Sequence, residues 1–131
     1  MPQLPREQLL RAALTIVGLV SLLGVYPLMQ LWPAGWRWHP YHPPYEHMII
    51  AVYATLGVFL LRAARRPEQH RSLILFAGWS SVVHGGIMAV HAARTVGERG
   101  HLVGDVPILV VAGTLLLLLA PPSESGGAWR W

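Results

Sequence analysis

Imidazole and carboxylate groups are concentrated in one short stretch of a sequence that is otherwise poor in charged residues. The segment HPYHPPYEH, residues 39–47, holds three histidines and one glutamate. Two further histidines, His84 and His91, lie within an apolar segment. Imidazole nitrogens and carboxylate oxygens can together bind transition metals such as Zn, Cu or Fe. The sequence therefore predicts a site for a metal ion or a small polar ligand, with Glu46, His47, His84 and His91 at its centre.

Four more polar residues flank the apolar segments and could complete this site as outer contributors: His39, His42, His101 and Asp105. The spacing of these ligands matches no metal-binding motif, so the metal is not identified. Two structural alternatives stay open. The loop histidines could be solvated at a membrane surface, and His84 and His91 could form hydrogen bonds between helices.

Other chemistries are less well supported by the spacing. A single haem could lie between His47 and His91, but His84 would then lack a partner at its own depth. A proton pathway through Glu46 would need a further ionisable group in the inner half of the protein. Ser80 lies four residues before His84, but no third residue orients the imidazole and no oxyanion hole is evident. We therefore assign no catalytic residue, and an enzyme is the less favoured interpretation.

Long apolar segments must position these side chains. About twenty mostly apolar residues are needed to cross a bilayer core as a helix, and four segments meet this requirement: residues 9–31, 45–64, 72–95 and 102–120. The chain is 53% hydrophobic and 12% charged, whereas soluble domains carry about 25% charged residues. The sequence predicts an all-α, integral membrane four-helix bundle that forms one domain over residues 1–131, with a loose tail at 121–131.

The arginines predict the orientation of this bundle, because loops rich in Arg tend to face the cytoplasm. Seven lie in the N-terminal segment, the turn between the second and third spans, and the tail: Arg6, Arg11, Arg62, Arg65, Arg66, Arg71 and Arg130. The opposite side has only three: Arg37, Arg94 and Arg99. We expect both termini in the cytoplasm of a bacterium and the histidine-rich loop on the outer side of its inner membrane.

Helical rise predicts the depth of the central residues. His91 should lie level with His47, and His84 about 10 Å deeper. Ionisable groups within a span usually face the bundle interior and pair, so we expect Glu46 to bind one of the histidines. Small residues also recur every four positions along the third span: Ser81, Gly85 and Ala89. Such a ridge allows close helix packing in lipid.

The composition excludes several classes of function. The chain has no cysteine, so disulfides and thiolate chemistry are excluded. No phosphate-binding loop or nucleic-acid-binding motif is present, and the arginines sit at the ends of apolar segments, which suits membrane orientation. The expected partner is the lipid bilayer, with a membrane-protein partner or a second copy of the chain as further options.

The middle third of the chain carries three recognisable stretches. Residues 56–61 read LGVFLL, a short basic turn containing RP and HRSLI follows, and residues 79–84 read WSSVVH. Together they resemble an uncharacterised family of small multi-span bacterial membrane proteins, a domain of unknown function. This resemblance implies a multi-span membrane protein and brings no known activity, ligand or functional residue.

The favoured hypothesis is an outward-facing His/Glu site that binds a metal ion or a small polar ligand. The first alternative is an accessory or assembly subunit of a larger membrane complex, whose histidines hydrogen-bond between helices and whose small-residue ridge contacts a partner. The second alternative is a small oligomeric transporter, because four short spans leave little room for a private pathway.

Overall fold

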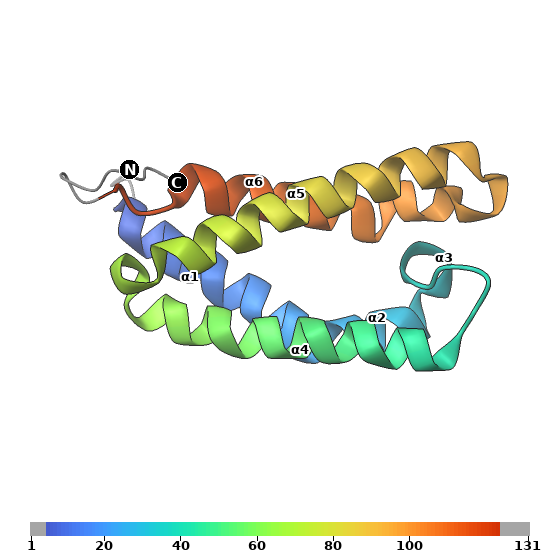
Figure 1. Ribbon diagram of the computed structural model, residues 1–131, viewed down its shortest axis with the longest axis horizontal. Coiled ribbons are helices and arrows are strands. Elements are labelled where there is room, and N and C mark those ends of the chain that lie inside the picture. The colour runs from blue at the N-terminus through green and yellow to red at the C-terminus, as the bar shows by residue number, and fades with distance from the viewer. Residues whose placement is uncertain (1–4, 124–131) are drawn as a thin grey trace.

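The computed structural model describes residues 5–123, and every regular element in that range is helical. The helices form two antiparallel pairs that lie side by side along the long axis (Figure 1). One pair contains the first two apolar segments, and the other contains the last two. We call the end at which α1 begins and α6 ends the terminal end, and the opposite end the loop end.

The first apolar segment is one long helix in three parts: α1 (Arg6–Leu19), a π-helical turn η1 (Val20–Gly24) and α2 (Val25–Leu31). The widened turn ends three residues before Pro27, whose ring and missing N–H disturb the hydrogen bonds of a regular α-helix at the preceding turn. The short helix α3 (Pro33–Trp36) follows at the loop end. It starts at proline, which is tolerated there because the first N–H of a helix has no partner within the helix.

The remaining helices run between the two ends. Helix α4 (Pro43–Arg65) returns to the terminal end, and the 3₁₀ turn η2 (Pro67–His70) connects it to α5 (Arg71–Arg94). At the loop end α5 leads into the 3₁₀ helix η3 (Val96–Val103), and α6 (Asp105–Leu119) completes the second pair.

Within residues 5–123, three helices are long and apolar enough to cross a membrane, and a fourth qualifies only if η3 and α6 count as one span. Helix α6 has 15 residues, about 22 Å at the usual helical rise, and a 40° bend separates it from η3. The prediction of a helical fold with several membrane-length apolar helices is confirmed. Of the predicted tail, residues 124–131 lie outside the described residues.

Glycines allow the helices of each pair to approach closely. A Cβ atom on Gly57 of α4 would lie 2.6 Å from the carbonyl oxygen of Gly18 in α1. A Cβ atom on Gly113 of α6 would lie 2.7 Å from the carbonyl oxygen of Gly78 in α5. Both positions therefore require glycine, as close helix contacts in membranes often do.

The small-residue ridge of α5 lies partly in the same α5–α6 contact. A Cβ atom on Gly85 would lie 2.9 Å from Cγ2 of Val110, and one on Gly113 would lie 3.0 Å from Cβ of Ser81. Ala89 is half-buried. Two of the three ridge residues thus face another helix of this chain.

The buried core occupies the terminal end, where all four long helices meet: Leu10, Leu14, Leu60, Ala63, Ile74, Ala77, Leu116 and Ala120. Two arginines donate hydrogen bonds to backbone carbonyl groups at this end. Arg6 donates hydrogen bonds to the carbonyl oxygens of Leu118 and Ala120, and Arg71 donates to that of Pro121. These bonds serve carbonyl groups at the end of α6 that have no partner within the helix.

Candidate functional site

The structure does not bring the four central candidates together. Glu46 instead forms a two-fold ion pair with Arg37, with Nε–Oε2 and Nη2–Oε1 distances of 2.9 and 3.0 Å. This hydrogen bonding raises the pKa of Arg37. The guanidinium also lies over the ring of Tyr41, 4.6 Å from its centroid. The partner of Glu46 is thus an arginine of the preceding loop and not, as the sequence predicted, one of the histidines.

The histidines of the predicted site are distributed over different surroundings. His47 is exposed on α4. Nδ1 of His84 lies 3.4 Å from the hydroxyl oxygen of Tyr53, and His91 lies farther along the same face of α5. His42 and Glu46 line a separate cavity of about 480 Å³ near the surface.

Within residues 5–123, no group of three or more His, Asp or Glu side chains is arranged to hold a metal ion. The geometry of the described residues therefore offers no support for the metal hypothesis. A single haem held by His47 and His91 gains no support either, because His91 lines the large cavity between the helices and His47 does not.

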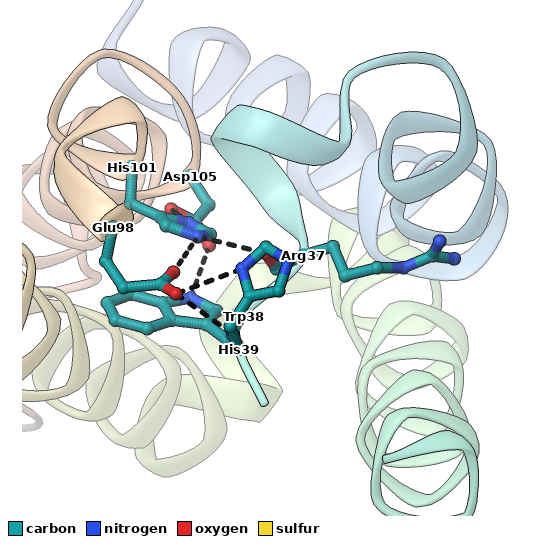
Figure 2. A network of polar contacts seen from close by, with 6 residues as sticks. All are labelled: Arg37, Trp38, His39, Glu98, His101 and Asp105. Carbon is teal, nitrogen blue, oxygen red and sulfur yellow. Dashed lines mark hydrogen bonds and ion pairs between the residues drawn. The ribbon is translucent and has the colours of Figure 1, made fainter. Parts of the chain in front are cut away.

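A different set of polar residues meets at the loop end, and we call it the polar cluster: Trp38, His39, Glu98, His101 and Asp105 (Figure 2). His101 is its centre, with Nδ1 2.8 Å from Oδ1 of Asp105 and Nε2 3.1 Å from Oε2 of Glu98. The indole N–H of Trp38 donates to Oδ2 of Asp105 at 3.1 Å. The backbone N–H of His39 donates to Oε1 of Glu98 at 3.1 Å, and its Nδ1 lies 3.0 Å from the same oxygen. Three predicted outer contributors, His39, His101 and Asp105, thus meet here.

The centre of the polar cluster is buried. The His101 side chain is 1% exposed, and those of Glu98 and Asp105 are 7% exposed. The indole of Trp38 stacks on the His101 ring, with centroids 4.0 Å apart and planes 20° apart. Nε2 of His101 also faces the carbonyl oxygen of Arg37 at 3.3 Å. Both imidazole nitrogens therefore face oxygen atoms already, which leaves neither free to bind a metal.

Sequence spacing explains half of the polar cluster. Glu98, His101 and Asp105 are separated by three and four residues, which are spacings that bring side chains together over about one helical turn. The second of these contacts crosses the bend at Gly104 between η3 and α6. Asp105 is the first residue of α6. A carboxylate at this position is stabilised by the positive end of the helix dipole.

Close backbone contact between α3 and η3 explains the other half. A Cβ atom on Gly100 would overlap the carbonyl group of Ala34, and one on Gly104 would overlap that of Gly35. Because these glycines have no side chain, α3 packs directly on η3 and carries Trp38 toward Asp105. Burial of Trp36, which is 6% exposed, anchors α3 at this position.

Two members of the polar cluster were not among the predicted site residues. Glu98 lies in a segment that the sequence analysis treated only as a short connection, and Trp38 was not considered as a hydrogen-bond donor. The periodic set Glu98, His101 and Asp105 was the available signal, because it places three ionisable groups on one helical face.

A cavity of about 800 Å³ lies between the two helix pairs, and we call it the interhelical cavity. Its walls come mainly from aliphatic side chains of α1, α2, α4, α5 and α6. On α5 the lining residues recur every three or four positions and so share one face of the helix: Ala77, Ser81, His84, Met88, His91 and Thr95.

The two ends of the interhelical cavity differ in chemistry. Leu60, Ala77 and Leu116 of the buried core line it at the terminal end. At the loop end the lining includes Glu98 and Asp105, together with Trp38 and His39 of the same polar cluster. The cavity therefore has a long apolar part and one polar end.

Comparison with known proteins identifies a family but no characterised relative. No curated protein and no solved structure matches this chain. Residues 5–126, nearly the whole chain, match a family of unknown function, DUF6632. The chain therefore belongs to the family of unknown function DUF6632.

Proposed function

We propose that this protein is a multi-pass membrane protein that binds an amphiphilic small molecule in the interhelical cavity. The observation that carries the proposal is the cavity of about 800 Å³ with apolar walls and one polar end. Ligand pockets have volumes of about 300–1,000 Å³, with mainly hydrophobic linings and a few polar groups that orient the guest. An elongated amphiphile, with a polar head toward the polar cluster, matches this distribution.

The surface of the protein supports entry of such a guest from lipid. Exposed aliphatic residues such as Ile16, Val111 and Leu115 are 63%, 57% and 44% exposed and also belong to the cavity lining. A guest dissolved in the bilayer could therefore reach the cavity between the helices without crossing a polar surface.

This proposal revises the hypothesis of a small His/Glu site. His84, His91 and Asp105 remain candidates because they line the interhelical cavity, whereas Glu46 and His47 do not. The accessory-subunit alternative loses part of its basis, because Ser81 and Gly85 face α6 of the same chain. The arginine distribution still supports the proposed orientation, with both termini cytoplasmic in a bacterial inner membrane.

Filling the cavity tests the proposal. Ala112 lines it from α6, whereas Ala51 is exposed on α4 and belongs to neither described cavity. Ala112→Phe should occupy part of the volume, and Ala51→Phe makes the same change on the outside of the bundle. The wild-type chain and both variants would be isolated in lipid nanodiscs, and the molecules retained by each would be quantified by mass spectrometry.

We expect the wild-type chain and Ala51→Phe to retain the same enriched amphiphile and Ala112→Phe to lose most of it. Equal retention by Ala112→Phe and the wild-type chain would show that the cavity is not the binding site. Circular dichroism and size-exclusion chromatography of each variant would establish that the helices and the monodisperse state are preserved.

A further inference from the structure

We propose that the interhelical cavity selects a lipophilic cation, whose positive charge lies at the polar cluster beside Glu98 and Asp105. This inference rests on the proposed function and specifies the class of molecule that is bound. Three features of the cavity support it: the charge of the lining, one unpartnered oxygen and the aromatic residues at the same end.

The lining of the interhelical cavity contains acidic residues and no arginine. Glu98 and Asp105 both line it, and none of the lining residues is an Arg. The chain has no lysine either, because all of its permanent cations are arginines. Arg37, whose carbonyl oxygen faces His101, directs its side chain away from the polar cluster (Figure 2) and forms an ion pair with Glu46. No permanent cation of the lining therefore neutralises these two carboxylates.

The imidazoles of the polar cluster compensate this charge only in part. His101 is the one buried imidazole in contact with both carboxylates. Imidazole carries no permanent charge, so neither His101 nor His39 is a fixed cation beside the two carboxylates. A cationic guest at this end of the cavity would supply that positive charge.

Glu98 supplies a separate observation that indicates a ligand. Its Oε2 atom is buried and has no hydrogen-bond partner among the described residues. Nε2 of His101 lies 3.1 Å away, but the hydrogen-bond geometry of that nitrogen suits the carbonyl oxygen of Arg37 at 3.3 Å. Buried polar atoms are rarely left unpaired. Glu98 lines the cavity, so a cation at this end would lie beside its incompletely paired carboxylate.

Aromatic residues at the same end have ring faces of the kind that contact cations. Trp38 and the buried Trp36 both line the cavity. Indole faces attract ammonium-type cations through the ring quadrupole, and such rings combine with carboxylates in sites for quaternary ammonium groups. The apolar wall then accepts the rest of the molecule. From Thr95 to Ala77 it follows α5 for about 27 Å at the usual helical rise.

The first experiment varies the charge of the ligand and leaves the protein unchanged. Tetraphenylphosphonium and tetraphenylborate have the same four rings and opposite charge. Their binding to the wild-type chain in dodecyl maltoside would be measured by isothermal titration calorimetry, with empty micelles as the blank. We expect saturable binding of tetraphenylphosphonium at least about tenfold tighter than that of tetraphenylborate, because the carboxylates attract the cation and repel the anion. Equal binding of the two ions, or tighter binding of the anion, would overturn the inference.

The second experiment removes charge from the protein. Glu98→Gln and Asp105→Asn should each weaken tetraphenylphosphonium binding by about tenfold, because each removes one negative charge beside the cation. Glu68→Gln changes an exposed glutamate in η2, outside the lining, and should leave binding unchanged. Unchanged binding in both cavity variants would also overturn the inference. Ala112→Phe separates the two proposals: if it still removes the retained amphiphile while ion selectivity is absent, the cavity is a binding site but not for a cation.

Discussion

Replacement of His101 by alanine is the strongest test of the polar cluster as a structural unit. The imidazole is 1% exposed and lies 2.8 Å from Asp105 and 3.1 Å from Glu98. His101→Ala removes it and leaves two carboxylates, each 7% exposed, without their shared partner. Removal of one partner from a buried ion pair typically costs about 3–5 kcal/mol.

The lower part of this range is expected here, because each carboxylate keeps one other contact. Trp38 still donates to Asp105, and His39 still donates to Glu98. We therefore predict that His101→Ala lowers the free energy of unfolding by about 3 kcal/mol. The assay is unfolding by titration with sodium dodecyl sulfate from mild detergent micelles, followed by tryptophan fluorescence, to which Trp36 and Trp38 at the loop end contribute.

His47→Ala is the matched control, because His47 is an exposed histidine on α4. Surface substitutions usually change stability by no more than about 0.5 kcal/mol. The triple variant His101→Leu, Glu98→Gln, Asp105→Asn should recover part of the loss, because it removes the charges together with their partner. If His101→Ala and His47→Ala unfold at the same detergent concentration, the ion pairs around His101 do not stabilise the fold and the reasoning is refuted.

Two further predictions concern other parts of the fold. Gly57→Val should destabilise the α1–α4 pair by about 2 kcal/mol through overpacking, because its Cβ would lie 2.6 Å from the backbone of Gly18. Gly86→Val is the control, because a Cβ at Gly86 meets nothing within 4 Å. Equal unfolding of the two variants in the same detergent titration would contradict the prediction. Glu46→Gln should weaken the ion pair that holds Arg37 and speed trypsin cleavage after that residue in limited proteolysis, and unchanged cleavage would show that this pair does not hold the loop.

Much of the helical framework follows from local sequence properties. Apolar length predicts the long helices, because a bilayer core requires about twenty apolar residues per span. The fourth segment shows the limit of this reasoning. Gly104 interrupts it just before α6, with φ −107° and ψ −111°, so the helix that follows has only 15 residues. The mean hydropathy of a segment does not reveal such a break, although the break ends one helix and begins another.

The candidate site could be predicted only in part, because partner choice depends on tertiary geometry. The expected pairing of Glu46 with a histidine relied on comparable depth, but depth does not fix how a helix is rotated about its axis. Arg37 lies only nine residues before Glu46 in the sequence, and it forms the ion pair in place of a histidine. His101 and Asp105 were predicted as outer contributors because they flank the start of the fourth apolar segment. Their contact with each other was not predicted, although it spans only four residues. Their contact with Trp38 depends on the glycine contact between α3 and η3 and could not be read from one segment.

The position of the polar cluster along the bundle suits the proposed membrane location. Ionisable groups near the middle of a bilayer are expensive and tend to lie near interfaces or in pairs. The polar cluster lies at the loop end, which would be near an interface in the proposed orientation, and His101 lies beside both of its carboxylates. A guest with its cation there and its apolar part toward the buried core would have the same head-to-tail direction as the surrounding lipids of that leaflet. It could then enter from the leaflet without inversion, so the proposed cation selectivity requires only lateral movement between the helix pairs.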